Sequence, residues 1–138
     1  MRIQFIASMA AVVADPAPAR CLFGDALGLN FEGAVEDYVF TEKLEGAKHF
    51  GLWPLKHAAQ ACFGRDAWPA GLPVPHACIE FEVAGAGEVE EAAAELEGRG
   101  YRLLHPTKTE PWGQTLTRLM TPEGLIVGIC YTPHMHNR

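Results

Sequence analysis

The feature that most constrains this fold is one order of secondary structure that occurs twice. Each half of the 138-residue chain reads as a strand, a helix and three further strands. In the first half, the first strand is expected over 3–13 and the helix over 16–27. In the second half, they are expected over 76–83 and 88–99. A glycine follows each helix directly, as the usual left-handed C-cap does. The repeat predicts two modules that bury their apolar faces together.

Three strand-like segments follow each helix. They are expected over 29–33, 37–43 and 48–52 in the first half, and over 101–104, 114–120 and 125–131 in the second. A short helix over 55–63, ending at Gly64, and a proline-rich linker over 65–75 connect the halves. The chain is therefore predicted to be one α+β domain, 1–138, made of two β-α-β-β-β modules over about 1–64 and 76–133.

The last two strands form the clearest local motif. Residues 115–120 alternate apolar with polar side chains, and residues 125–131 are nearly all apolar. Pro122-Glu123-Gly124 between them supplies a tight turn, because proline presets φ and glycine accepts positive φ. Glu110-Pro111-Trp112-Gly113 precedes the hairpin. A half-buried strand, a turn and a fully covered strand are predicted.

This hairpin and its E-P-W-G run resemble the closing segment of the glyoxalase/bleomycin-resistance/dioxygenase superfamily, and the resemblance extends from Phe5 to Pro133. It implies an open, curled eight-stranded sheet around a cleft, with the helices outside. It also implies a homodimer. Some members of that superfamily hold a metal ion and catalyse reactions, whereas others only bind small molecules.

Composition excludes several classes of function. The net charge of −6 argues against nucleic acid, which requires a basic surface, and no run of eighteen apolar residues predicts a membrane span. Four cysteines without a C-x-x-C pair are interpreted as reduced. The apolar segment 3–13 has features of a signal peptide, but Asp15-Pro16 after it is a helix start, so a strand and a cytoplasmic protein are predicted.

The resemblance also implies where metal ligands would lie. Carried over residue by residue, the four positions are Ser8, Trp53, Cys78 and Gly128. Serine is a poor ligand, indole and glycine are not ligands, and one thiol does not hold zinc alone. No metal and no cofactor are therefore expected.

Displaced ligands provide an alternative. His49, His76 and Glu80 would be a chemically acceptable set of imidazole and carboxylate donors. The terminal His134-Met135-His136 is expected to be a mobile tail. His76, Cys78, Glu80 and Glu82 share one face of their strand, and two glutamates predict that this face is wet or meets a partner.

Without a metal, the cleft is expected to bind through shape, stacking and polar anchors. The candidate ligand-binding residues are Trp112, Trp53, Tyr38, Phe40, Glu42, Cys78, Gln114 and Arg118. Trp68 in the linker is interpreted as a core residue or part of a lid. Aromatic rings beside carboxylates favour a small organic ligand that is aromatic or cationic.

The leading hypothesis is a metal-independent small-molecule binding protein of the bleomycin-resistance type. One alternative is a metal-dependent or acid/base lyase, isomerase or dioxygenase of the same superfamily, with Glu80 or His76 as the catalytic group. A second alternative is a non-catalytic accessory subunit.

Overall fold

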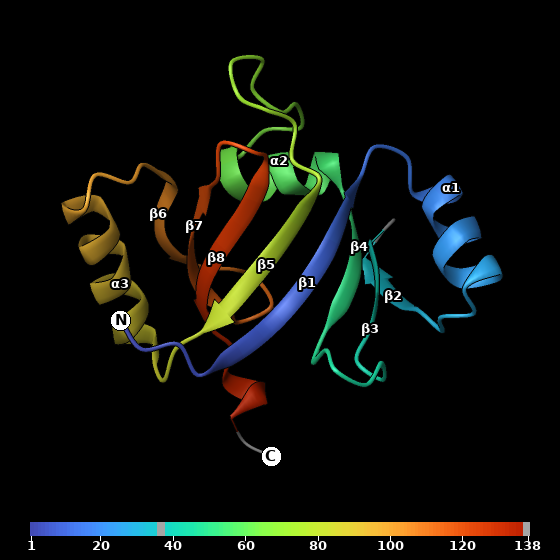
Figure 1. Cartoon of the computed structure of the whole chain (residues 1–138), viewed down its shortest axis with the longest axis horizontal. Coiled ribbons are helices and arrows are strands. Elements are labelled where there is room, and N and C mark those ends of the chain that lie inside the picture. Colours follow the sequence, from blue (N-terminus) through green and yellow to red (C-terminus); the bar gives the residue numbers. More distant parts are fainter. Residues whose placement is uncertain (36–37, 137–138) are drawn as a thin grey trace.

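A computed structural model describes residues 1–35 and 38–136 (Figure 1). Over these residues the chain forms one open, eight-stranded mixed sheet with three α-helices, which confirms the predicted α+β fold. The strands are β1 (Phe5–Val13), β2 (Glu32–Val35), β3 (Tyr38–Thr41), β4 (Phe50–Pro54), β5 (Ala77–Glu82), β6 (Leu103–Thr109), β7 (Thr115–Met120) and β8 (Leu125–Tyr131). The helices are α1 (Pro16–Arg20), α2 (Leu55–Phe63) and α3 (Ala86–Gly98), with a π-helix η1 (Cys21–Ala26) and a 3₁₀ helix η2 (Pro133–Met135).

The strand order is β2-β3-β4-β1-β5-β8-β7-β6. Within the first half β1 pairs with β4 in parallel, and within the second β5 pairs with β8 in parallel. The antiparallel pair β1–β5 joins the two halves within one chain, at the centre of the sheet. The four strands from each half therefore share one continuous surface.

Two helices lie outside the sheet, on opposite sides of its centre (Figure 1). Asp15 caps α1 by accepting a hydrogen bond from the Ala17 amide, and the helix continues directly into η1. On the other side, Val89 and Ala92 of α3 pack against Val83 and Ile129. None of the helices in the described part of the chain has the length and apolar character that crossing a bilayer requires.

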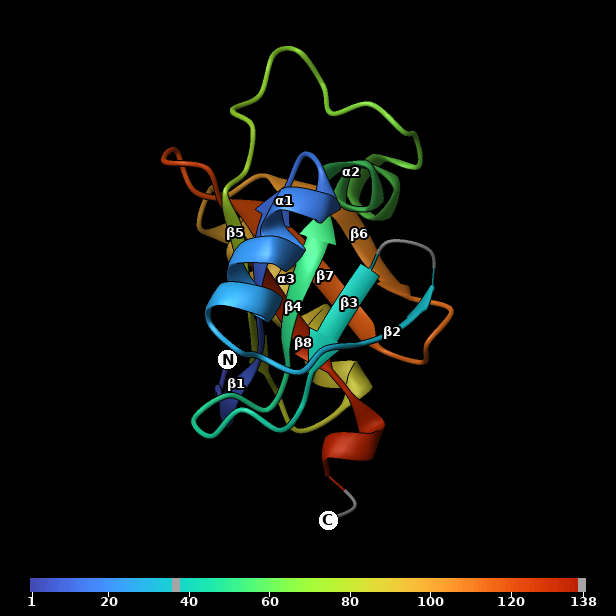
Figure 2. The ribbon, with the colours of Figure 1, turned by 90° about the vertical axis from the view of Figure 1, so that its right-hand side faces the viewer.

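The connecting helix α2 lies on the opposite face of the sheet from α3. Its Cys62 packs against Cys78 of β5 and Ile126 of β8, with Trp53 beside them. It ends at Gly64, whose φ of 72° is the left-handed conformation that favours glycine. We call the face that carries Cys78 and Ile126 the inner face, and the face that packs against α3 the outer face. Helix α2 therefore covers one end of the inner face, and η2 lies at the other end of the molecule (Figures 1 and 2).

The C-terminal residues of the described chain are ordered, so the expectation of a mobile tail was wrong. Met135 of η2 is buried against Ala7, Leu116 and Cys130. The ring of His136 is also fixed, since its Nε2 lies 2.7 Å from a Glu82 carboxylate oxygen. Burial of one methionine and one ion-pairing contact hold this segment against the inner face.

Several strand bounds differ from the sequence prediction. Strand β6 was expected over 101–104 but spans Leu103–Thr109 and includes Pro106. Proline cannot donate to a ladder, and it is tolerated here because β6 is an edge strand. Strand β2 begins three residues later than expected, and Asp37, the predicted first residue of the next strand, lies outside the described residues.

Candidate functional site

The inner face of the sheet carries a row of polar residues across five strands. Ser8 pairs with Glu80, Glu80 with Gly128, and Gly128 with Arg118. Arg118 then pairs with His105 on the edge strand β6. We call Ser8, Glu80, Gly128, Arg118 and His105 the polar row. The row runs between the end of the inner face that α2 covers and the end that η2 covers.

Glu80 is the carboxylate at the centre of this row, and it is only 9% exposed. The Ser8 hydroxyl donates to its Oε1 at 2.7 Å, and the Gln114 amide donates to the same oxygen at 3.0 Å. A Cβ at Gly128 would lie 3.1 Å from Glu80 Cγ, so this glycine makes room for the side chain. Two donors and one glycine therefore fix the carboxylate over β8.

The E-P-W-G run connects this carboxylate with the surface. Glu110 and Gln114 close the turn through a 2.8 Å backbone hydrogen bond, and Gly113 has a φ of 90°. Trp112 is 60% exposed, yet its indole N–H donates to Gln114 Oε1 at 3.0 Å. The amide of Gln114 also donates to Thr132 at 3.1 Å. A chain of hydrogen bonds thus runs from an exposed indole to buried Glu80.

Arg118 is the cation of the row and is 1% exposed. Its Nη1 lies 3.1 Å from His105 Nε2 and 3.5 Å from Glu110 Oε1, and its Nε is buried without a partner. His105 Nδ1 lies 2.7 Å from the Pro106 carbonyl oxygen, so Nδ1 carries the proton and Nε2 accepts from Arg118. Burial lowers the pKa of His105 to about 4, which keeps the ring neutral.

Glu110 offsets part of this buried positive charge. Its Oε1 lies 3.1 Å from Lys108 Nζ and faces Arg118 as well. The Arg118 guanidinium also lies 5.5 Å from the centre of the Trp53 ring, within cation–π range. Trp53 and Arg118, which were both predicted to bind ligand, are therefore in contact on the inner face.

A second polar chain joins Tyr38 of β3 to Glu42, just after β3, and His49, just before β4. Tyr38 Oη is 2.6 Å from His49 Nε2, and His49 Nδ1 is 3.0 Å from Glu42 Oε2. The Phe40 ring stacks on His49 at 4.8 Å. A Cβ at Gly51 would lie 2.5 Å from Tyr38 Oη, so this phenol lies directly over the β4 backbone.

The pKa of Tyr38 is raised above its ordinary value. The largest cause is burial, followed by the negative charge of Glu80, then Cys78 and Glu42. The phenol is therefore kept in its protonated form.

From Cys78 to Glu82 the strand face that carries Glu80 is dry. The expectation was that this face is wet or meets a partner: the wet alternative was wrong, and contact with a partner stays a prediction. Cys78 is 3% exposed, Glu80 9% and Glu82 fully buried. Glu82 accepts hydrogen bonds from the Thr132 amide and hydroxyl and contacts His136. The C-terminal segment supplies these partners, and they make burial of the carboxylate tolerable.

The structure brings most predicted site residues onto one surface. Glu80, Gln114 and Trp112 form one hydrogen-bonded chain, Trp53 meets Arg118, and Tyr38 and Glu42 share His49. Cys78 packs under α2 with its thiol pKa raised by burial. His76 lies at the edge of this surface, beside the turn glycine Gly124.

The carried-over metal positions do not form one row. Ser8 and Gly128 flank Glu80, whereas Cys78 pairs with Ala10 and Trp53 with Val12. Within residues 1–35 and 38–136, no three histidine, cysteine, aspartate or glutamate side chains are grouped to hold a metal ion. The displaced set of His49, His76 and Glu80 is accordingly not assembled among these residues.

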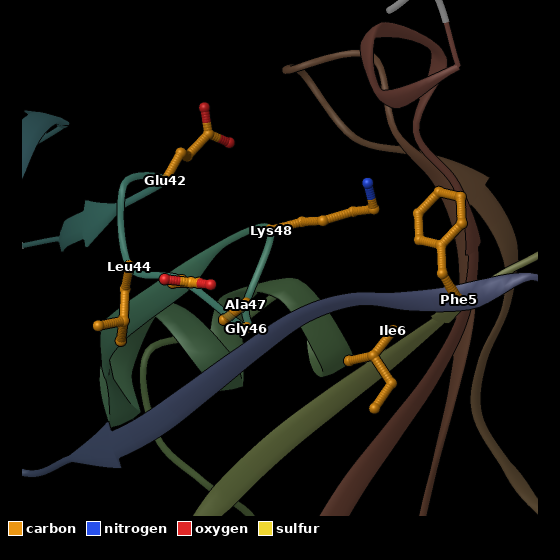
Figure 3. A pocket seen from close by; sticks show the side chains of 8 residues that line it. Phe5, Ile6, Glu42, Leu44, Gly46, Ala47 and Lys48 are labelled. Atoms are coloured by element: carbon orange, nitrogen blue, oxygen red, sulfur yellow. The ribbon is translucent and has the colours of Figure 1, made fainter.

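A shallow, open pocket lies at the η2 end of the molecule (Figure 3). It has a volume of about 550 Å³, and Glu42 contributes to its wall. Lys48 extends toward Phe5 here, with Nζ 4.7 Å from the ring centre. The lining residues are Phe5, Ile6, Glu42, Leu44, Glu45, Gly46, Ala47 and Lys48.

Sequence reasoning missed His105, Thr132 and Glu110 as members of the site. Their roles depend on partners that lie 13, 18 and 8 residues away in the chain. His49 was considered only as a metal ligand. Because Thr41 of β3 pairs with Phe50 of β4, the next residues along these antiparallel strands, Glu42 and His49, lie opposite each other. Correct strand pairing would have been the signal that found it.

Comparisons with known proteins support the fold. No family model and no curated protein matches the sequence. A superfamily member from Vibrio splendidus 12B01 aligns with a TM-score of 0.59 at 16% identity, over 93% of this chain and 98% of its own. A methylmalonyl-CoA epimerase variant from Streptomyces coelicolor aligns with a TM-score of 0.54 at 15% identity, over 96% of both chains.

A structure described as an NAD-dependent benzaldehyde dehydrogenase from Legionella pneumophila aligns with a TM-score of 0.62 at 14% identity, over 90% of this chain and 96% of its own. At such identities the likeness establishes the fold and not the activity. The chain therefore has the fold of the glyoxalase/bleomycin resistance protein/dioxygenase superfamily.

Proposed function

We propose that the inner face of the sheet binds a small organic molecule that is aromatic or cationic, without a metal ion. The observation that carries this proposal is the central Glu80, which is held by Ser8 and Gln114 and linked to exposed Trp112. A fixed carboxylate in a dry, mostly apolar site with a few convergent polar groups is typical of small-molecule binding.

The chemistry of the surrounding residues supports this ligand class. Phe40, His49 and Tyr38 present nearly parallel rings, which suit a planar molecule. Glu42 adds negative charge beside these rings, since it contacts His49 Nδ1 at 3.0 Å. An organic cation that stacks there is expected to gain about 0.5–2 kcal/mol per ring contact.

Glu80, Gln114 and Arg118 are almost fully buried. A ligand therefore reaches them only if a neighbouring side chain moves. Trp112 is the side chain that we expect to move, since one hydrogen bond holds it and most of it already faces solvent. Ligand binding should consequently change the tryptophan fluorescence.

The proposal is tested by fluorescence titration with acridinium and phenanthridinium dyes and with uncharged analogues of the same ring size. Wild-type protein should bind the cations at about micromolar concentration. Glu80→Gln keeps the shape of the side chain and removes its charge, so cation affinity should fall about tenfold while the neutral analogues change little. Failure of every dye to bind would overturn the proposal.

Trp68→Phe is a matched control for these titrations. Trp68 stacks edge-on against Phe63 at 5.0 Å and donates to the Pro73 carbonyl, so its ring is held by α2 and the linker. Its replacement should leave dye binding unchanged, whereas Trp112→Phe should reduce the fluorescence response. Metal analysis of the purified protein provides a second check, and a stoichiometric ion would contradict metal-free binding.

A cytoplasmic homodimer is part of this proposal. Ile6 and Met9 of β1 are 47% and 41% exposed and pair with Phe81 and Ile79 of β5. Strand β1 lies at the centre of the sheet, between α1 and α3 (Figure 1). Apolar exposure of this kind supports contact with a second copy. Light scattering should give twice the 15.0 kDa chain mass, and Met9→Lys should shift the protein toward monomer.

A further inference from the structure

Tyr38, His49 and Glu42 are connected in the order phenol, imidazole, carboxylate. The phenol oxygen lies 2.6 Å from Nε2, and Nδ1 lies 3.0 Å from Glu42 Oε2. These are hydrogen-bond distances at both ring nitrogens. The same sequence of groups activates nucleophiles in hydrolases, where a base is oriented by a third side chain.

The direction of the two hydrogen bonds follows from the chemistry of the end groups. An ionised carboxylate only accepts, so Glu42 holds the ring tautomer with the proton on Nδ1. Nε2 then has a lone pair, and the Tyr38 O–H donates to it. The oxygen of Tyr38 is left with lone pairs directed away from His49.

The position of the phenol is fixed from three sides. Tyr38 lies over Gly51, its ring packs 5.8 Å from Phe40, and its partner His49 stacks on Phe40. Next to Gly51 on the sheet lies Ala10, a small residue, which pairs with Cys78 beside Glu80. The phenol oxygen therefore stands over the part of the inner face that carries small side chains.

We propose that Tyr38, His49 and Glu42 form a proton relay that makes Tyr38 a general base toward a carbonyl compound with a hydrogen on the adjacent carbon. This inference rests on the proposed function, since it uses the same surface for binding. Burial and the nearby carboxylates raise the pKa of Tyr38, so a free phenolate does not form and the proton must pass to His49.

The reaction step balances without a further reagent. The C–H bond of the bound carbonyl compound breaks, and its electron pair moves into the carbonyl group to give an enolate. The proton joins Tyr38 Oη while the original phenolic proton moves to His49 Nε2, and the imidazolium is paired with the Glu42 carboxylate. Return of a proton to the same or the neighbouring carbon gives exchange or isomerisation and restores the relay.

Chemical labelling tests the relay without any substrate. Benzenesulfonyl fluoride reacts with an activated tyrosine: an O–S bond forms, the S–F bond breaks, fluoride leaves and the phenolic proton passes to His49. Tyr101 is 54% exposed and serves as an internal control. Peptide mass spectrometry should show Tyr38 labelled at least tenfold faster than Tyr101, despite its lower exposure.

Two variants test whether fast labelling of Tyr38 is caused by the proton relay or only by access of the reagent to the side chain. His49→Phe keeps a ring on Phe40 and removes the proton acceptor, so labelling of Tyr38 should fall at least tenfold. Glu42→Gln changes a side chain that is 32% exposed, so folding should be preserved while labelling falls several-fold. Equal labelling of Tyr38 and Tyr101 in wild type, or an unchanged Tyr38 rate in both variants, would overturn the relay.

Hydrogen exchange then tests the reaction. Phenylpropan-2-one is incubated with the protein in D₂O, and deuterium at the benzylic carbon is followed by NMR. Wild type should exchange it, and Tyr38→Phe, which keeps the ring and removes the hydroxyl, should lose at least 90% of the rate. If wild type binds the ketone without exchanging its hydrogen, the proposed reaction is wrong but the binding function stands. If wild type does not bind the ketone, the proposed function is contradicted, and the labelling experiment alone decides whether the relay exists.

Discussion

At the scale of single residues, the site depends on two glycines that leave space for functional side chains on neighbouring strands. Tyr38 lies over Gly51 and Glu80 lies over Gly128, and a Cβ at these positions would lie 2.5 and 3.1 Å from Tyr38 Oη and Glu80 Cγ. Neither glycine is required by a positive φ, since both have ordinary strand conformations. Their role is to leave space, which is a requirement that only the folded sheet reveals.

Gly128→Ala is expected to displace the Glu80 side chain from Ser8 and Gln114. Overpacking of this kind costs about 1–3 kcal/mol, measured as the free energy of unfolding in urea. Gly71→Ala is the matched control, because nothing lies within 4 Å of its Cβ position and its φ is not positive. Equal stability of the two variants would contradict the close packing at Gly128.

His105 should make stability depend on pH. Its pKa falls from 6.5 to about 4 on folding, so the folded state favours the neutral ring. The stabilisation is complete above pH 6.5 and is lost as the pH falls toward 4, a total of about 3 kcal/mol. In His105→Gln, which still offers Arg118 an acceptor, urea unfolding between pH 6.5 and 4 should lack this loss.

At the scale of elements, η2 is the segment whose importance was least visible beforehand. Met135→Ala should lower the free energy of unfolding by about 2 kcal/mol or more, because Met135 packs on Ala7, Leu116 and Cys130. His134→Ala, on a side chain that is 60% exposed, should change it by less than about 0.5 kcal/mol. Similar values for both variants would show that η2 is not packed.

The local sequence pattern predicted the bounds of some helices and strands correctly and the bounds of others wrongly. Helix α2 and strand β8 have the expected limits, because Gly64 ends one and the Pro122–Gly124 turn starts the other. The bounds of β6 failed, since Pro106 counts against a strand unless the strand is known to be an edge. The row around Glu80 also escaped prediction, because a register shift between Ile6 and Ser8 moves the pairing of β1 with β5.

Strand alternation placed two glutamates on one face, and the expectation that water covers that face was wrong. Glutamates on a strand normally indicate water, and Glu82 is dry only because Thr132 and His136, 50 and 54 residues away, supply its partners. Aromatic residues were the better guide, since Tyr38, Phe40 and Trp53 all lie on the inner face. Long-range hydrogen bonds are therefore the part of the site that a single sequence conceals.

At the scale of the whole molecule, the two halves should unfold together. The clusters on the inner face mix them: Ala7 packs with Leu116 and Cys130, and Cys62 packs with Cys78 and Ile126. Urea unfolding followed by tryptophan fluorescence and by far-UV circular dichroism should give coincident single transitions. Two separate transitions would contradict a single domain.

The central place of β1 has a consequence for synthesis on the ribosome. Its neighbours β4 and β5 both come later in the chain, and β5 ends at Glu82. Until those residues have left the exit tunnel, an apolar strand with two open edges is available to chaperones and to other nascent chains. A stalled chain that ends before β5 should consequently be captured by a holdase, whereas one that extends past β8 should escape it.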